Sequence, residues 1–450
     1  MKVKRIIALG LAALLLLLPF TGCEKKTPPE PLTYDELNAT DTLVLYVLEE
    51  QESIFRSIAA RFTASTGITP ELFVVEGDLD VYQERVAADL AAGSGPDVLF
   101  LSYLDNLDVA KAVQNYNFLD LTEILATDPE FSEEDFVDGV FDAGKFNGRQ
   151  YTVPQSFYLP FYLSSGTKFD ILEDQGFEWE EINTTSEFME EMGRLTPLVE
   201  ELPSFLRMMQ SWNFASRFFQ NSGIRLIDYD NGEVLPDAES LQTFMEGYKA
   251  YYPYDYDGTG VSWWENRGAQ YLLHGSYYFF NTNWSQDLLQ DIDELIEAGH
   301  GYELHIMPSQ AGDVVGRITG QMAINAATQN TLNAYKFIQY MLSEEEQSSG
   351  SALIKPVPIR KDSIRAIIHG KYTKMAISIG LPGYKSEYLT EEEMNKIVEL
   401  LMSADRYIQD DPRPTLEMMW DAMNPFLRDE KSYEECFDDL KNKLTLYLSE

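Results

Sequence analysis

The sequence is poor in cysteine, histidine and basic residues, and each shortage excludes a class of function. Its 450 residues include two cysteines and four histidines, with no paired CxxC spacing that would build a structural zinc site. Lysine and arginine number 34 against 74 aspartates and glutamates, which gives a formal net charge of −40. Because a surface of that charge repels nucleic acid and anionic lipid headgroups, we expect neither as a partner.

Motifs of the common enzyme and cofactor classes are also missing. The chain has no GxSxG, P-loop or GxGxxG in a suitable context, and its order of elements is not that of an eightfold barrel. The segment YPYDYDGTG (252–260) resembles part of a calcium loop, but Asn266 stands where an EF-hand has its twelfth-position acid. We therefore expect no catalysis, no cofactor and no metal site.

The longest apolar run lies at the N-terminus. Three basic residues within the first five positions precede the run 6–20, which is shorter than the roughly 20 apolar residues of a membrane span and has the flanks of an export signal. It ends in FTGC (20–23), which resembles the lipobox of bacterial lipoproteins, although Phe20 stands where leucine is usual. The resemblance implies that residues 1–22 are a signal peptide and that Cys23 is lipidated; an uncleaved signal anchor is the alternative.

A polar segment with three prolines follows this cysteine. Residues 23–40 have the composition of an extended, flexible tether rather than of a packed segment. A lipid, a tether and a globular body together describe a protein held at the extracytoplasmic face of the cell membrane. Cys436 is then left without a disulfide partner, and we interpret it as a buried small hydrophobic residue.

Strands and helices alternate in the first part of the body. Apolar runs typical of buried strands occupy 42–50, 68–77 and 96–102, and amphipathic helical patterns occupy 51–67 and 82–95 between them. This order predicts an α/β fold with a parallel sheet and helices on its faces.

The loop that follows the third strand is the first predicted ligand-facing segment. Open α/β sheets bind ligands beyond the C-terminal ends of their strands, and here that end carries Tyr103, Asp105 and Asn106. Asp97 lies at the opposite end of the strand, where its carboxylate can accept backbone N–H groups of the turn. We therefore interpret Asp97 as structural.

Further along, the chain is richer in helical patterns and aromatic residues. The segment 228–235 predicts a hairpin with Asn231-Gly232 at its corner, and 274–284 and 301–309 predict strands. Ser343 is expected to cap a short helix with three glutamates in its first turn, and the last 60 residues are expected to be helical.

Seven stretches in unbroken order carry a family resemblance. They are LVLYVLEE…ARFTASTGI, GSGPDVLFLSYLD, FNGRQYTVPQSFYLPFYLSS, HGSYYFFNTNW, GYELHIMPS, MAINAATQNTLNAYKFIQYMLSEEEQ and KPVPIRKD. Together, behind a lipobox-like signal, they resemble family 1 of the bacterial extracellular solute-binding proteins, the maltose-binding type, over most of residues 41–450. The resemblance implies a two-lobed α/β fold of the periplasmic-binding-protein type II (Venus flytrap), in which each lobe is a sheet flanked by helices.

The resemblance also implies how the chain divides between the lobes. We place its three crossings in the proline-containing stretches 151–154, 307–309 and 355–358. The predicted composition is then 41–152 with 308–355 for lobe 1, and 153–307 with 356–450 for lobe 2. A cleft between two such lobes is where a small molecule is expected to bind.

Particular sugar-contacting positions follow from the same resemblance. In this family aromatic rings stack on the apolar face of a pyranose, and acids and amides bind its hydroxyl groups. The matching positions here are Glu49, Glu50, Asp105, Tyr158, Trp284 and Trp420. Glu50 stands where relatives carry a lysine, and Tyr158 where they carry an acid. Two further candidates, chosen by residue type and position, are Arg317 and Trp264 of the pair Trp263-Trp264.

Most of these candidates have a structural alternative. Trp420 lies on an amphipathic helix and can be a core residue, and Glu49 and Glu50 can be solvated loop acids. One tryptophan of the 263–264 pair is expected in the core, and Arg317 can pair with one of the many acids instead of a ligand.

The sequence as a whole predicts a monomeric, lipid-anchored substrate-binding protein of an ABC transporter. It would capture a mono- or oligosaccharide and deliver it to the permease subunits in the membrane, held there through the lipid on Cys23. The alternatives are a polyamine- or other metabolite-binding protein, a surface-anchored carbohydrate-active enzyme, for which two carboxylates suffice, and an adhesin that keeps the same fold.

Overall fold

The computed structural model describes residues 30–40, 42–199, 212–251, 284–349, 357–370 and 385–449. The chain divides into two compact units, 1–30 and 31–450, and everything below concerns the second. Within the described residues, no helix combines the length and the apolar character that crossing a membrane requires.

The N-terminal part of the body forms the predicted α/β alternation. Strands β1 (Leu43–Leu48), β2 (Pro70–Val75) and β3 (Val98–Phe100) are parallel, and helices α2 (Glu52–Thr66) and α3 (Leu79–Ala91) connect them. All five elements are confirmed. Two local signals set the helix ends: the residue after α2 is a glycine with φ 77°, and an aspartate caps the start of α3 by accepting a hydrogen bond from a backbone N–H.

Asp97 is structural, as predicted, but its partners lie in other elements. Its carboxylate accepts a hydrogen bond from the backbone N–H of Val44 on β1 at 2.7 Å, rather than from the turn, and another from the hydroxyl of Thr328. Burial raises the pKa of this carboxyl, and the two hydrogen bonds partly oppose that rise. Asp97 therefore ties β3 to β1 and to the chain that follows the long strand β11 (Val315–Ile324).

Strands from distant parts of the chain complete one seven-stranded sheet. Its order is β12-β6-β11-β3-β1-β2, and β13 pairs in parallel with β11 outside this order. The added strands besides β11 are β6 (Val153–Tyr158), β12 (Val357–Pro358) and β13 (Arg406–Ile408). Strand β11 is antiparallel to both β3 and β6. The predicted crossings at 151–154 and 355–358 thus lead into neighbouring strands of this sheet.

A two-stranded ribbon extends from this region. Strand β10 (Tyr302–Ile306), predicted over 301–309, pairs antiparallel with β7 (Phe161–Ser165). The strand predicted over 274–284 lies outside the described residues, except that Trp284 begins helix α13 (Trp284–Glu297).

Helices form most of the remaining residues that the structure describes. The hairpin β8 (Ile227–Asp228) and β9 (Glu233–Val234) is confirmed around Gly232, whose φ is 66°. The short helix after Ser343 is confirmed as well, since this serine accepts the N-capping hydrogen bond. The C-terminal region is helical apart from β13. The helices are α4 (Val109–Gln114), α5 (Thr122–Thr127), α6 (Gly166–Asp174), α7 (Thr185–Leu195), α9 (Trp212–Asn221), α10 (Ala238–Tyr251), α14 (Thr331–Met341), α15 (Glu344–Gln347), α16 (Lys361–Ile368), α18 (Glu391–Leu401), α19 (Arg413–Leu427) and α20 (Tyr433–Ser449).

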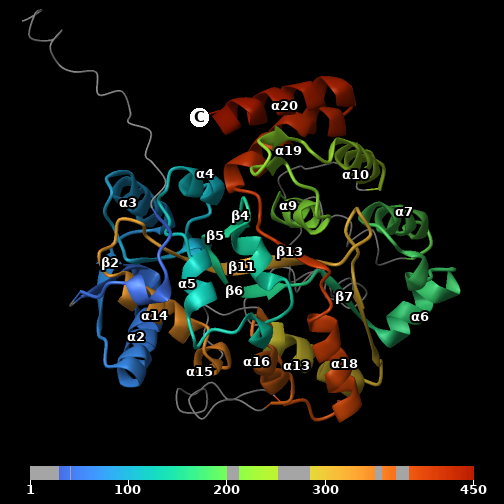
Figure 1. Cartoon of the computed structure of the whole chain (residues 1–450). Helices are drawn as coiled ribbons and strands as arrows, with labels where there is room; N and C mark the ends of the chain where they lie inside the picture. The colour runs from blue at the N-terminus through green and yellow to red at the C-terminus, as the bar shows by residue number, and fades with distance from the viewer. Residues whose placement is uncertain are drawn as a thin grey trace, which may run out of the picture. The chain divides into compact units, whose positions relative to one another are not determined.

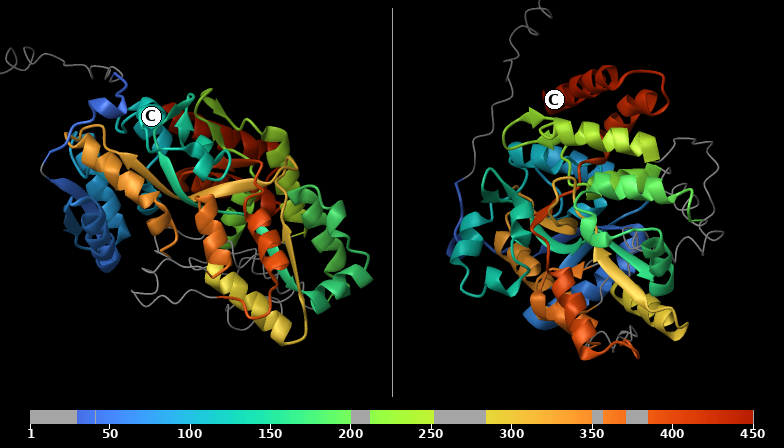
Figure 2. Two further views of the ribbon diagram at one scale, coloured as in Figure 1. Left: turned by 60° about the horizontal axis from the view of Figure 1, so that its bottom comes forward. Right: turned by 90° about the vertical axis from the view of Figure 1, so that its right-hand side faces the viewer.

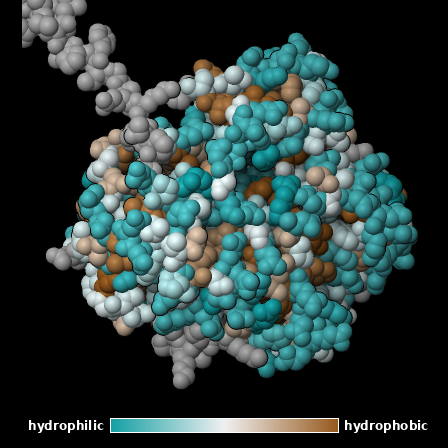
Figure 3. Space-filling view, viewed as in Figure 1, coloured by the Kyte–Doolittle hydropathy of each residue, from teal (hydrophilic) through white to brown (hydrophobic). Residues whose placement is uncertain are grey.

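Three clusters of buried apolar side chains hold these elements together. One lies within predicted lobe 1 around α3 and β3, and one within predicted lobe 2 around α7, α9, α10, α19 and α20. The largest cluster contains residues of both predicted lobes, such as Leu45 on β1 and Ile397 on α18. Figures 1 and 2 show α2 and α3 at one end of the central sheet and α6 and α7 beyond the other. Hydrophilic residues cover much of the face shown in Figure 3.

Candidate functional site

Polar side chains gather at the C-terminal ends of the parallel strands. Glu49 and Glu50 form a short 3-10 turn directly after β1 and are exposed, and Tyr103 closes the turn that follows β3. The Glu49 carboxylate accepts a hydrogen bond of 3.1 Å from the backbone N–H of Gly77, beyond the end of β2. Burial, aided by the charge of Glu50, raises the pKa of Tyr103 to about 12. The structure thus brings these residues to one edge of the sheet.

Asp105 lies on the same edge and contacts a distant element. Its carboxylate accepts a hydrogen bond from the side-chain amide of Gln83 on α3. Its backbone carbonyl accepts a hydrogen bond of 3.3 Å from the backbone N–H of Arg413, the first residue of α19. The loop after β3 therefore meets the start of a helix from predicted lobe 2, which makes this junction the centre of the candidate site.

Arg317 is committed to the protein itself in this conformation. It is 1% exposed, and its Nε donates to Asp410 at 2.8 Å while another guanidinium nitrogen donates to the backbone carbonyl of Gln220 at 2.6 Å. Asp411 follows Asp410 in the sequence. Burial and the charge of Asp410 raise the pKa of Asp411 to about 6, and the charge of Arg317 acts in the opposite direction. These contacts match the structural alternative for Arg317, which is pairing with an acid rather than with a ligand.

Tyr158 and Trp420 both lie in the core cluster of predicted lobe 2. Tyr158 is 3% exposed and donates a hydrogen bond of 3.0 Å to Asn221. Trp420 is 8% exposed, and its ring packs against Tyr248 and Phe219 with centroid separations of 5.5 and 6.5 Å. Within the described part of the chain, its indole N–H has no hydrogen-bond partner. In this conformation both rings are largely enclosed by protein.

Three predicted positions lie outside what the structure describes. Trp264 and Cys23 fall outside the described residues, and of Trp284 only the backbone at the start of α13 is described. The structure therefore brings together Glu49, Glu50 and Asp105, and separately Tyr158 and Trp420.

A second junction, which sequence reasoning missed, is centred on Asp108. One carboxylate oxygen accepts hydrogen bonds of 2.8 Å from the hydroxyls of both Tyr229 and Tyr447, and the other caps α4 through the backbone N–H of Lys111. An aspartate three residues before that N–H is a recognisable capping signal. Its tyrosine partners, 121 and 339 residues away, leave no local trace in the sequence.

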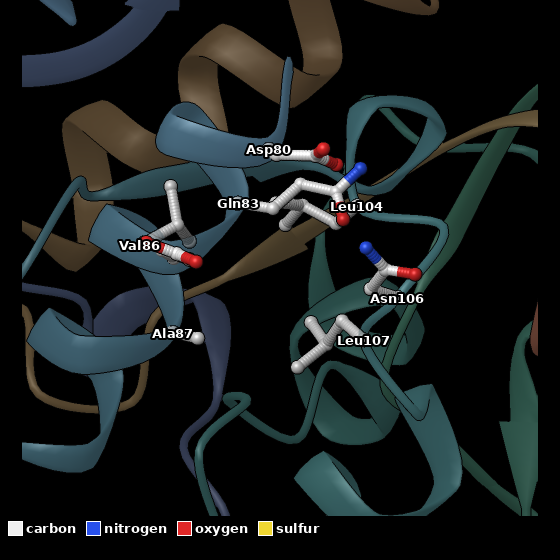
Figure 4. A pocket seen from close by; sticks show the side chains of 8 residues that line it. Asp80, Gln83, Val86, Ala87, Leu104, Asn106 and Leu107 are labelled. Atoms are coloured by element: carbon white, nitrogen blue, oxygen red, sulfur yellow. The ribbon is translucent and has the colours of Figure 1, made fainter. Parts of the chain in front are cut away.

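A pocket of about 320 Å³ opens beside Asp105, between α3 and the loop that follows β3 (Figure 4). Its lining residues are Asp80, Gln83, Glu84, Val86, Ala87, Leu104, Asn106 and Leu107. In the described part of the chain, no three histidine, cysteine or acidic side chains are grouped so as to hold a metal ion. The candidate site thus combines carboxylates, amides and a tyrosine at the strand ends with a pocket lined by both polar and apolar side chains.

The family follows from comparison with known proteins. The family model of the bacterial extracellular solute-binding proteins matches residues 47–348. The chain belongs to this family. Membership confirms the resemblance seen in the seven sequence stretches, and it implies a solute-binding role with an ABC transporter and an extracytoplasmic location. No curated protein sequence matches this solute-binding protein.

Solved structures of solute-binding proteins share its fold. The sugar-binding protein MalE from Xanthomonas citri is 16% identical, with a TM-score of 0.60 over 91% of this chain and 97% of MalE. The cyclic α-maltosyl-1,6-maltose binding protein from Arthrobacter globiformis is 14% identical, with a TM-score of 0.53 over 93% and 99%. UgpB from Mycobacterium tuberculosis, in complex with glycerophosphocholine, is 14% identical, with a TM-score of 0.53 over 91% and 99%. The predicted two-lobed α/β fold class is confirmed.

Proposed function

We propose that this solute-binding protein captures a mono- or oligosaccharide outside the cytoplasm and delivers it to the permease of an ABC transporter. The observation that supports this most directly is the junction at Asp105, where acids, amides and a tyrosine at the strand ends meet the start of α19. Sugar hydroxyls need several hydrogen-bond acceptors and donors at once, and carboxylates and amides provide them. Nothing in this role requires catalysis.

The solute class rests on the site, because the fold alone carries many functions. Two of the structural neighbours named above are described as binding sugars, whereas UgpB was solved with glycerophosphocholine. Acceptor groups at Glu49, Glu50 and Asp105 suit a ligand that is rich in hydrogen-bond donors. This favours a sugar over an anionic solute.

A ligand-stabilisation screen tests the binding role. The purified full chain is heated with and without single neutral mono- and oligosaccharides, amino acids and phosphorylated metabolites. A ligand at 100 times its Kd adds about 2.7 kcal/mol to the free energy of unfolding, so a cognate sugar raises Tm clearly. Asp105→Asn should reduce that rise, while Asp174→Asn on the exposed surface of α6 should not. A rise with phosphorylated metabolites alone would overturn the sugar assignment.

Membrane attachment is proposed from the FTGC sequence at 20–23. The lipid on Cys23 would hold the protein beside its permease, and the tether would let the body reach it. Cys23→Ala should move the protein from the membrane fraction to the soluble fraction of cells. An unchanged membrane fraction would instead indicate an uncleaved anchor.

A further inference from the structure

The polar part of the pocket beside Asp105 consists of carboxylates and amides, without a cationic side chain. Asp80 and Gln83 on α3 lie on one side, and Asn106 lies on the loop opposite (Figure 4). Glu84, also on α3, is a further lining residue. Val86, Leu104 and Leu107 supply apolar surface between them. Among the described lining residues there is no lysine, arginine or histidine. A cationic ligand group that enters therefore meets acceptors and no like charge on this lining.

The acceptor of this pocket that most needs a donor is the side-chain oxygen of Gln83. Its residue is 6% exposed, and its Nε2 donates to the Asp105 carboxylate. That contact fixes the orientation of the amide, because exchanging Oε1 and Nε2 would set two acceptors against each other. Its Oε1 is buried and has no hydrogen-bond partner among the residues that the structure describes. A buried acceptor without a donor costs free energy, which a ligand donor would recover.

The charges around the pocket favour a cation. Glu84 has no hydrogen-bond or ion-pair partner among the described residues, and Asp80 lies one helical turn before it on the same face of α3. Arg413, at the start of α19, is a cation on which the charge of Asp80 acts, and its guanidinium pairs with Glu417 at 2.9 Å. That hydrogen bond chiefly, and then the charges of Asp105 and Asp80, raise the pKa of Arg413. Asp80 and Glu84 thus line the pocket without a basic residue beside them in the lining.

We propose that this pocket binds a protonated amino group of the solute, with the ring that carries it resting on the apolar surface. The ammonium would donate to Gln83 Oε1 and lie between the Asp80 and Glu84 carboxylates. This inference rests on the proposed function in one respect, namely that the amine is carried by a sugar. A polyamine offers the same protonated amine without a ring, and the experiment separates the two sources.

The experiment measures binding of matched ligands to the purified full chain by calorimetry. The ligands are oligomers of glucosamine, the same oligomers with every amine acetylated, neutral malto-oligosaccharides and spermidine. Free glucosamine oligomers should bind roughly tenfold more tightly than their acetylated counterparts, because acetylation removes the charge and keeps the ring. The preference should disappear at a pH above the pKa of the ligand amine.

Substitutions of single pocket residues test which side chains bind the amine. Glu84→Gln should weaken binding of glucosamine oligomers roughly fivefold and leave the acetylated oligomers unaffected, since a partly exposed charge pair contributes modestly. Gln83→Leu should weaken both. Glu71→Gln, an exposed acid on β2 outside the pocket, is the matched control for net charge and should change neither.

The outcomes separate this inference from the proposed function. Equal affinity for free and acetylated oligomers overturns the amine site and keeps the saccharide-binding role. Binding of spermidine alone, weakened by Glu84→Gln, keeps the amine site and overturns the sugar role. Binding of glucosamine oligomers that Glu84→Gln and Gln83→Leu both leave unchanged removes the pocket from recognition.

Discussion

The two ends of the central sheet use their predicted ligand residues differently. In the part of the sheet formed by β1, β2 and β3, Glu49, Glu50 and Asp105 follow the C-terminal ends of parallel strands and are exposed, where a solute can reach them. In the helical core beyond the other end, Trp420 is enclosed by aromatic rings. Arg317, between the two, is held by an acid and a carbonyl.

This difference shows that positions assigned by one family resemblance can have two different roles in this chain. A position aligned with a sugar contact can serve the ligand at one end and the stability of a lobe at the other. Stability and affinity measured on the same variants distinguish these roles, and the following substitutions are ordered from the largest expected effect to the smallest.

Trp420→Ala should produce the largest loss of stability. Removing a buried indole leaves a cavity against Phe219 and Tyr248, which costs about 3–5 kcal/mol of the free energy of unfolding. Urea denaturation measures it. Trp420→Phe, which keeps most of the packing, should cost less than half as much. If Trp420→Ala unfolds like the native chain yet loses its solute, Trp420 belongs with the strand-end residues instead.

Arg317→Met should cost about 3 kcal/mol, because it removes the partner of Asp410 and leaves the Gln220 carbonyl without a donor inside the protein. The control is Arg56→Met on α2, whose pair with Glu52 is exposed, and it should change the free energy by less than about 0.5 kcal/mol. Equal effects of the two substitutions would show that the buried arginine has no special structural role.

Local pattern explains what could be predicted from the sequence. The strands around α2 and α3 have continuous apolar runs, and Gly67 and Asp78 end and begin the helices, so this half of the sheet could be read residue by residue. Asp105 was found because it follows a strand. Gln83 was missed, since as one polar position on an amphipathic helix it carries no signal of its contact with Asp105, 22 residues away.

Long-range pairing explains what could not be predicted. Arg317 is recognisable as a possible partner of an acid, but nothing near it in the sequence selects Asp410, 93 residues later, from so many carboxylates. The place of Trp420 in the core likewise depends on how α9 and α10 pack against α19, which the periodicity of α19 alone leaves open between core and cleft.

Asp411→Asn should alter the dependence of stability on pH by about 2 kcal/mol. A carboxyl whose folded pKa is raised to about 6 favours the folded state below its unfolded pKa near 4, and that contribution is lost as the pH rises through 6. The asparagine variant lacks this loss, so its stability relative to the native chain should increase between pH 4 and pH 7. Screening of the partly exposed carboxylate keeps the change below the full shift. Parallel pH profiles of the two proteins would show that Asp411 has no raised pKa.

Tyr229→Phe and Tyr447→Phe should have the smallest effects, about 1 kcal/mol each, since each removes one hydrogen bond to the Asp108 carboxylate. Tyr388→Phe, at an exposed position, should leave the free energy of unfolding unchanged.

The double variant Tyr229→Phe/Tyr447→Phe tests whether Asp108, in predicted lobe 1, is coupled to both tyrosines of predicted lobe 2. Both tyrosines donate to the same oxygen, so losing one leaves the other to satisfy it, and losing both leaves the buried carboxylate oxygen without a donor. The double variant should therefore lose about 1 kcal/mol more than the sum of the single variants. Additive losses would mean that the hydroxyls act independently. A further outcome is that the double variant loses more stability than the sum and also binds its solute more weakly. That result would mean that α4, the β8–β9 hairpin and α20 are held together when the solute is bound. The exposed strand-end residues would then be linked to the helical core.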